Sequence, residues 1–250
     1  MQTEHLTFYH GTGAAAANTI LNCGARNSLF EDIGARELGQ EIRRALLDCT
    51  GFASNEDWRF HSLSGPGIET SGLWVLVLQQ LEHPEDSSLI EYGHFFATLN
   101  IANAYRYSRN PYRSEFILAL AESLKFLDHL GHSLPQSVAT RFPEVARLID
   151  FPSSPVVLEL SGICSERLSS ERGGDEIEAT LEEFQLMQQF QGVNAPASLR
   201  IRAVSSADVV AVHDLSGWNL EEIHDGLWRP DPSRVSEVRH SVRDWLAKGV

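Results

Sequence analysis

The stretch FYHGTGAAAANTILNCGAR, residues 8–26, joins an extended start to a helical continuation. The apolar and aromatic residues 6–9 predict a short strand. The alanine-rich residues 13–23 predict a helix, with Gly24 placed to end it. Tyr9-His10-Gly11-Thr12 therefore stands where a strand meets a helix. An imidazole at that point adds little to packing, so the question is what it binds.

The rest of the chain mixes helical and extended segments. Apolar residues at helical spacing, or a capping residue such as Asn100, predict helices at residues 35–49, 101–109, 114–130, 135–150, 178–190 and 233–250. Short apolar runs bounded by turn residues predict strands at residues 91–99, 155–160, 199–204 and 208–215. Residues 51–71 and 162–179 are loop-like, and residues 72–82 fit a buried strand or a helix equally well.

These elements do not alternate regularly and show no repeat, which favours an α+β fold. A chain of 250 residues has room for one large domain or for one domain with a small addition. We expect a single domain over residues 1–250, in which helical insertions at about 30–85 and 110–150 interrupt a β core.

Composition limits the class of protein. The chain is 42% hydrophobic and 22% charged, as expected for a soluble globular protein with a core. Its formal net charge of −14 disfavours a sequence-independent grip on nucleic acid, although Arg106, Arg109 and Arg113 could form a local basic strip. No apolar run is long enough to cross a bilayer, so we expect no membrane partner.

The same reasoning bears on location. The first residues, MQTEHLTFYHGT, contain no basic segment followed by an apolar one, as a secretory signal would. The three scattered cysteines form no CxxC motif, which fits thiols in a reducing compartment. We therefore expect a cytoplasmic protein, or one delivered into a target cell without a classical signal peptide.

Several common catalytic and binding motifs are missing from the sequence. GTG at residues 11–13 lacks the third glycine and the later acidic residue of a dinucleotide-binding fingerprint. There is no GxxxxGK[ST], and neither Ser64 nor Ser216 fits GxSxG. His129 and His132 lack HExxH or a third ligand, so the sequence predicts no metal site.

The opening stretch does suit a flat polar ligand. A glycine leaves its backbone N–H and C=O open to an amide, while a neighbouring imidazole can bond a sugar hydroxyl. Such a site benefits from an aromatic ring that stacks on the ligand. The segment HFFATLNIANAYRYS, residues 94–108, offers Tyr105 for that purpose.

Three segments together resemble the ADP-ribosyltransferases of the diphtheria-toxin and poly(ADP-ribose)-polymerase type. YHGT (9–12) with ANTILNCGAR (17–26) resembles the first family segment, and FFAT (95–98) with ANAY (102–105) resembles the second. VVLEL, LRIRAV and DVVAV resemble the strands that close the family's sheet. The matched segments occur in the family's order, and the resemblance implies a split antiparallel β core.

The resemblance also implies NAD as co-substrate and gives roles to particular residues. His10 would be a catalytic residue that bonds ribose hydroxyls, and Gly11 would hold the nicotinamide carboxamide through its backbone. Tyr105 would be catalytic by stacking on the nicotinamide ring. Thr12 completes the His-Gly-Thr motif, and Phe95 stands where the family often has a second tyrosine; both are expected to bind NAD.

The family's catalytic glutamate has no obvious counterpart. The family pattern places it at residues 196–200, which contain no acidic residue. Glu183, in the Glu182-Glu183-Phe184 run, resembles the family's glutamate–aromatic pair and is our candidate for the third catalytic residue. Asn194 or Ser198 could instead bond a ribose hydroxyl without acid chemistry.

The resemblance implies a mono-ADP-ribosyltransferase that acts on a macromolecular acceptor, preferably a protein. It implies a bacterial or phage toxin or effector, for which an antitoxin or immunity protein would be a partner. Two alternatives stay open because of the missing glutamate. One is an inactive member of the fold that binds NAD or a protein, and the other is a transferase that modifies a specific nucleic acid.

Overall fold

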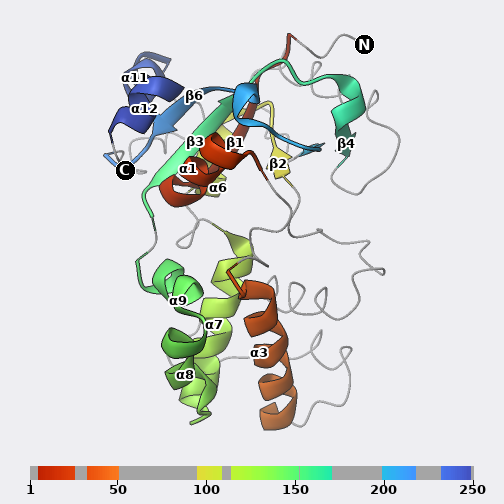
Figure 1. Ribbon diagram of the computed structural model, residues 1–250, viewed down its shortest axis with the longest axis vertical. Helices are drawn as coiled ribbons and strands as arrows, with labels where there is room; N and C mark the ends of the chain where they lie inside the picture. Colours follow the sequence, from red (N-terminus) through yellow and green to blue (C-terminus); the bar gives the residue numbers. More distant parts are fainter. Residues whose placement is uncertain are drawn as a thin grey trace. The chain divides into compact units, whose positions relative to one another are not determined.

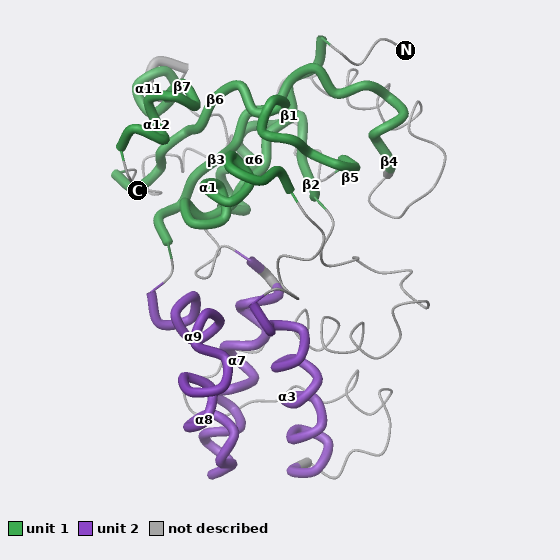
Figure 2. The backbone as a smooth tube through the Cα atoms, viewed as in Figure 1, with its two compact units in different colours: residues 1–26, 94–109, 153–250 green, residues 27–93, 110–152 purple. Residues whose placement is uncertain are grey.

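The computed structural model describes residues 5–25, 33–50, 95–108, 114–151, 153–170, 199–217 and 232–248. The chain forms two compact units, shown in different colours in Figure 2. Unit 1 contains residues 1–26, 94–109 and 153–250, and unit 2 contains residues 27–93 and 110–152. The two segments of unit 2 overlap in sequence with the two expected insertions. That the whole chain is a single domain with insertions stays a prediction.

The opening stretch forms a strand and a helix, as expected, with a later boundary. Strand β1 is Phe8–Gly13, so it continues through His-Gly-Thr-Gly. Helix α1 is Ala14–Cys23, and it ends where Gly24 adopts a φ of 75° and its N–H bonds the carbonyl of Ile20 at 2.7 Å. A positive φ is accessible to glycine at little cost, which explains the sharp stop.

Unit 1 is built on two antiparallel sheets (Figure 1). The first has the order β1-β3-β6-β7 and the second the order β2-β5-β4. Paired backbone bonds between Tyr9 and Thr98 link the two sheets. The strands are β2 Phe95–Ala97, β3 Pro155–Leu160, β4 Leu168–Ser170, β5 Leu199–Ile201, β6 Val209–Asp214 and β7 Arg239–Ser241, with short 3₁₀ turns at Ser165–Arg167 and Ser206–Asp208. The α+β class is confirmed.

The two faces of the four-stranded sheet carry different side chains. Because side chains alternate along a strand, Phe8 and its partner Leu160 lie on one face, while Tyr9 and Glu159 lie on the other. The Phe8 face packs against α1 and forms the main apolar core of unit 1 (Figure 1). The Tyr9 face packs against α6, Ile101–Ser108. Asn100 caps α6 as expected, because its Oδ1 accepts a bond from the N–H of Ala102 at 2.9 Å.

The prediction of one C-terminal helix over residues 233–250 is wrong. The segment contains α11 Pro232–Val238, the strand β7, and α12 Val242–Ala247. Strand β7 pairs with β6, so tertiary hydrogen bonds override the helical spacing of the sequence. Helix α12 is anchored by Trp245, which is buried and donates from Nε1 to the Asn18 Oδ1 of α1 at 2.8 Å.

Unit 2 is helical in the residues described, with α3 Ala35–Thr50, α7 Glu115–His129, α8 Leu134–Arg141 and α9 Pro143–Asp150. Their apolar faces share one core. The sequence predicted one helix over residues 135–150, but the chain breaks at Phe142. Pro143 has no N–H to bond and disfavours helical geometry at the preceding residue. The expected elements at residues 51–71, 72–82 and 178–190 lie outside the described residues.

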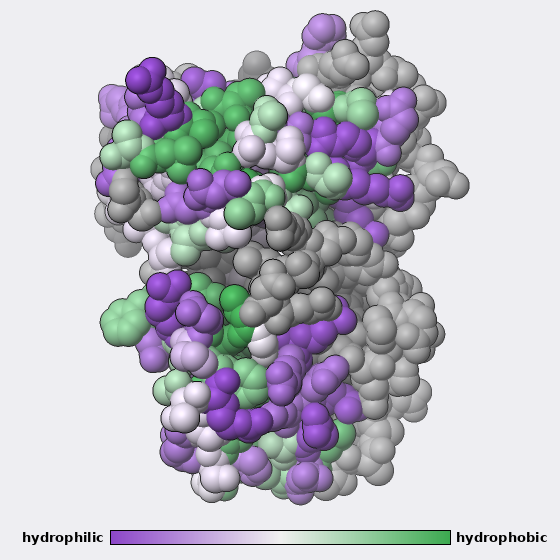
Figure 3. Space-filling view, viewed as in Figure 1, coloured by the Kyte–Doolittle hydropathy of each residue, from purple (hydrophilic) through white to green (hydrophobic). Residues whose placement is uncertain are grey.

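The visible surface mixes polar and apolar residues. In Figure 3, hydrophobic residues of unit 1 gather at the upper left, where Figure 1 draws α1, α12 and β6. Val210 and Leu246 are among the large apolar residues that are exposed on these elements. None of the described helices is both long enough and apolar enough to cross a membrane.

One glycine in β1 is required by packing. A Cβ at Gly11 would overlap the carbonyl oxygen of Ala104 and lie 2.7 Å from the backbone nitrogen of Ser108, both in α6. Both atoms belong to backbone and cannot rotate away. The backbone of α6 therefore approaches β1 more closely than any other residue at position 11 would allow.

We expect Gly11→Ala to lower the free energy of unfolding by about 3 kcal/mol, because strand and helix must separate to admit the methyl group. The matched control is Gly217→Ala, since no atom of the described residues beyond its chain neighbours lies within 4 Å of the position a Cβ would take there. Urea titration of the three proteins measures the difference. An equal midpoint for Gly11→Ala and the parent would contradict the packing argument.

Candidate functional site at the first strand

His10 lies midway along β1, on the face that carries α1. Its Nδ1 is 2.6 Å from the carbonyl oxygen of Phe96 in β2. Its ring also packs on Phe95, with ring centroids 4.1 Å apart and planes inclined by 30°. His10, Phe95 and Phe96 thus tie the first sheet to the second. The structure thus places residues of two segments that carry the resemblance, 9–12 and 95–98, in contact.

The bond to Phe96 fixes the chemical state of His10. A carbonyl oxygen only accepts, so Nδ1 must carry the hydrogen. Burial lowers the pKa of His10 to about 4, and the bond to Phe96 opposes this only in part. The imidazole is therefore neutral at neutral pH, with Nε2 as an acceptor. An acceptor at Nε2 suits a ligand hydroxyl that donates a hydrogen bond.

The backbone of Gly11 points away from β3. Tyr9 bonds Thr98 through both its N–H and its C=O, at 2.7 and 2.9 Å. Because these groups alternate in direction along a strand, the N–H and C=O of Gly11 point to the same side as those of Tyr9. In the part of the chain that the structure describes, no backbone bond to Gly11 comes from that side. Gly11 thus presents one donor and one acceptor at a strand edge.

The two other residues expected to bind NAD, Thr12 and Phe95, are both buried in unit 1. Thr12 is buried in β1 opposite Val156. Phe95 is buried in the core of unit 1, and its ring packs on the ring of His10. The NAD-binding roles of Thr12 and Phe95 stay predictions.

Tyr105 is buried in α6, with 3% of its surface exposed. Its hydroxyl is 3.2 Å from Nδ1 of His213 in β6, and the two rings meet edge to face. Nε2 of His213 is 2.9 Å from Oε2 of Glu159 in β3. Arg239 of β7 donates to both oxygens of the Glu159 carboxylate, at 2.8 and 3.0 Å. We call Tyr105, His213, Glu159 and Arg239 the polar network.

The charges of the polar network set the direction of its hydrogen bonds. Burial alone would raise the pKa of Glu159, but bonds from His213 and Arg239 outweigh it and lower the pKa to about 2. The carboxylate is therefore ionised and accepts from Nε2–H of His213. A neutral His213 would then accept from the Tyr105 hydroxyl through Nδ1, which lies 3.2 Å from it. Burial, with Tyr9 and Glu159 nearby, raises the pKa of Tyr105, so its hydroxyl keeps its proton.

His10 and Tyr105 lie on opposite faces of the first sheet. His10 shares its face with Leu158, and Tyr105 packs on the other face against Val157. The exposed tyrosine of α6 is Tyr107, at 47%. The stacking role of Tyr105 stays a prediction, and it requires a movement that uncovers its ring.

No sequence pattern marks His213 or Arg239 as a member of a site. They come from strands that join the sheet more than 50 residues after Glu159 in the chain. Glu159 alone carried a signal, since a carboxylate that alternates with buried apolar residues in a strand needs a partner.

The proposed carboxylate lies outside the structural description. Glu182, Glu183, Asn194 and Ser198 are not among the described residues. In β5, where the family pattern places its glutamate, Leu199 is buried and Arg200 lies over the Phe96 ring at 5.9 Å. The described part of this strand has no acidic residue.

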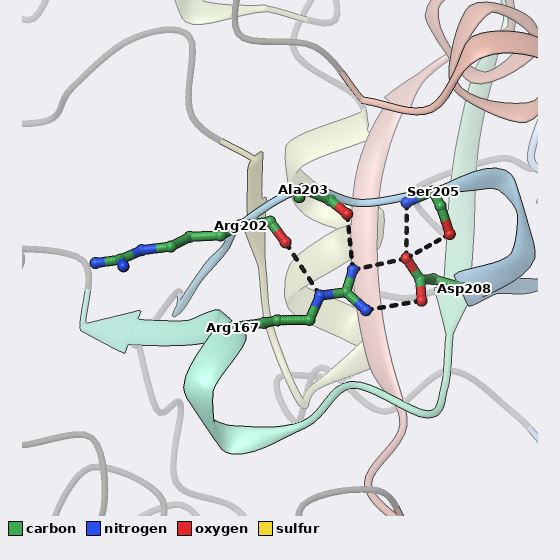
Figure 4. Close-up of polar contacts among 5 residues, drawn as sticks. All are labelled: Arg167, Arg202, Ala203, Ser205 and Asp208. Atoms are coloured by element: carbon green, nitrogen blue, oxygen red, sulfur yellow. Dashed lines mark hydrogen bonds and ion pairs between the residues drawn. The ribbon is translucent and has the colours of Figure 1, made fainter.

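The turn that follows β5 is held by an ion pair (Figure 4). Arg167 donates to both oxygens of Asp208, at 2.9 and 2.7 Å, and to the carbonyls of Arg202 and Ala203. Asp208 also accepts from the N–H and hydroxyl of Ser205. These bonds hold Ala203 at a φ of 52°, a left-handed conformation that alanine rarely adopts. The end of β5 is thereby fixed, while the Arg202 side chain points away from the pair.

Within the described ranges, no group of three histidine, cysteine or acidic side chains could hold a metal ion. Comparison of the chain with protein-family models, curated proteins and solved structures gives no match.

The shifted pKa values of His10 and Glu159 predict two pH ranges in which the free energy of unfolding falls as the solution is acidified. His10 has a pKa of about 4 when folded and 6.5 when unfolded, so the unfolded state binds more protons between these values. The free energy of unfolding contributed by His10 is fully present above pH 6.5 and falls as pH decreases to about 4. Glu159 changes from 4.5 to about 2 on folding, so its contribution falls between pH 4.5 and 2.

Denaturant titrations at a series of pH values, on the parent, His10→Gln and Glu159→Gln, separate the two ranges. We expect His10→Gln to reduce the pH dependence between 6.5 and 4, and Glu159→Gln to reduce it below 4.5. A slope between pH 6.5 and 4 that is unchanged in His10→Gln would show that His10 is not held neutral.

Proposed function

We propose that the chain binds NAD at the outer edge of β1 and transfers ADP-ribose from it to a macromolecular acceptor. The observation that carries this proposal is the pair formed by a neutral His10 and the backbone edge of Gly11, to which no described residue bonds. The resemblance of three segments to ADP-ribosyltransferases supplies the identity of the ligand. The antiparallel sheets of unit 1 are compatible with the split β core of that family.

The edge of Gly11 suits the carboxamide of nicotinamide. A primary amide has one acceptor and two donor hydrogens, and it can pair with a backbone C=O and N–H as a neighbouring strand would. The close approach of α6 covers the other side of Gly11. The amide would therefore bind at the edge of β1, where Gly11 projects its two polar groups.

His10 would bond a ribose hydroxyl through Nε2. The neutral ring accepts this bond without carrying a charge into a half-buried position. Its orientation is fixed by the Phe96 carbonyl and by the Phe95 ring, so little conformational freedom is lost on binding.

The reaction breaks the bond between C1′ of ribose and the nicotinamide nitrogen, and nicotinamide leaves with the electron pair. An acceptor nucleophile forms a new bond to C1′ and loses its proton. The protein assists by holding the leaving group and the ribose in fixed positions. We propose a protein as the acceptor, as expected for a toxin or effector.

A carboxylate is still needed to bond the 2′-hydroxyl and orient the acceptor. Glu159 is unsuited, because its oxygens are occupied by His213 and Arg239 on the β6 and β7 side of the sheet. Glu183 stays our candidate for this role. The alternative function, an NAD-binding protein without transferase activity, is favoured by the absence of an acidic residue in the described part of β5.

We expect His10→Ala to weaken NAD binding about 10- to 100-fold, as for the loss of one hydrogen bond at a partly buried site. His129→Ala is the matched control, because His129 lies at the exposed end of α7. Calorimetric titration with NAD measures binding, and a thermal melt of each variant shows that it is folded. If folded His10→Ala binds NAD like the parent, the proposed site is wrong.

Glu183→Gln distinguishes the transferase from the inactive protein. The change keeps the size of the side chain and removes its basicity, so we expect nicotinamide release to fall about 100-fold while NAD binding survives. Glu182→Gln is the neighbouring control and should change release little. A parent protein that binds NAD and releases no nicotinamide would favour the inactive alternative.

A further inference from the structure

The segment β2–α6 carries much of the proposed site, and the chain leaves unit 1 at both of its ends. Residues 94–109 belong to unit 1, while residues 27–93 and 110–152 belong to unit 2. Neither end of the segment therefore continues directly into another element of unit 1. Its position on the sheets depends on contacts that it makes itself.

Contacts at the start of the segment hold β2. The backbone of Thr98 bonds Tyr9, and Phe96 accepts the hydrogen of His10. Strand β2 also pairs with β5 over its three residues. These contacts all precede α6, so they do not fix the far end of the helix.

Near the far end of α6, the Tyr105 hydroxyl makes a long-range polar contact with His213 of β6. The carbonyl of Tyr105 also accepts from the Ser108 hydroxyl at 2.8 Å, which closes the last turn of the helix. Ala104 and Ser108, on either side of Tyr105 along the chain, are the residues whose backbone approaches Gly11. Tyr105 is thus well placed to hold this part of the helix against β1.

His213 is itself held in one orientation. It is 1% exposed, and its Nε2 bonds Glu159, which Arg239 holds from β7. The edge of the Tyr9 ring also faces His213, with centroids 6.3 Å apart. An imidazole fixed at Nε2 in this way presents the Nδ1 lone pair to α6, where the Tyr105 hydroxyl meets it.

We propose that His213 is a positioning residue, which seats α6 on β1 by accepting the Tyr105 hydroxyl and so preserves the geometry of the Gly11 edge. This role rests on the proposed function only for the identity of the ligand that binds at the Gly11 edge. Glu159 and Arg239 act through His213 by fixing its orientation. None of the three touches the ligand.

The seating of α6 is tested without any ligand by hydrogen exchange of the backbone amides of residues 104–108. We expect these amides to exchange about 10-fold faster in Tyr105→Phe and in His213→Leu, while the amides of β6 change less. His213→Asn should restore slow exchange, because its amide oxygen can accept from Tyr105. Tyr107→Phe is the control, a tyrosine on the same helix with 47% of its surface exposed.

Two further measurements complete the test. The ¹⁵N shifts of the His213 ring should show hydrogen on Nε2 and none on Nδ1. NAD should bind about 10-fold more weakly to Tyr105→Phe and His213→Leu, and like the parent to Tyr107→Phe. If His213→Leu fails to fold, Tyr105→Phe decides.

Exchange of the α6 amides at the parental rate in Tyr105→Phe, or a hydrogen on Nδ1 of His213, would overturn the proposal. Fast exchange in His213→Asn equal to that in His213→Leu would also overturn it, because the oxygen would then not matter. A parent that binds no NAD would instead overturn the proposed function. The exchange and NMR results would still decide the role of His213.

Discussion

The close approach of α6 to Gly11 is the constraint on which the rest of unit 1 depends. The backbone of Ala104 and Ser108 occupies the place where any other residue would carry its side chain. The backbone N–H and C=O of Gly11 lie in the plane of the sheet, on the side away from β3. The same approach brings Tyr105 down onto the sheet, where its hydroxyl reaches His213. One packing contact therefore places α6 within reach of the buried polar network.

The two histidines of this region show how environment sets chemistry. His10 has a backbone carbonyl as its partner, and burial lowers its pKa to about 4. His213 lies between a phenol and an ionised carboxylate, and each of its two ring nitrogens contacts one of them. Among the described residues, His10 has a partner for one ring nitrogen, whereas His213 has partners for both. The residue type alone therefore does not decide the chemistry of a histidine. Its hydrogen-bond partners decide it.

Much of the candidate site follows from local sequence. The strand and helix around His10 and the cap at Asn100 rest on short-range patterns. The break at Phe142 was also accessible, since Pro143 follows it. The polar network was not, because Tyr105, Glu159, His213 and Arg239 come from four segments whose pairing only the sheet order reveals. The side of the sheet on which Tyr105 lies was inaccessible for the same reason.

The C-terminal segment shows why helical spacing misleads near such a network. Residues 239–241 lie between two helices, and the helical spacing of apolar residues continues across them. They nevertheless form β7. Pairing with β6 places Arg239 opposite His213, from where its guanidinium spans both oxygens of Glu159. In a continuous helix, Arg239 would have no such position, and Glu159 would lose its two bonds to the guanidinium while keeping His213. Removing one partner of a partly buried ion pair costs on the order of a few kcal/mol, which exceeds the helix propensity of three residues. The need to pair Glu159 thus helps to set the secondary structure of a segment 80 residues away.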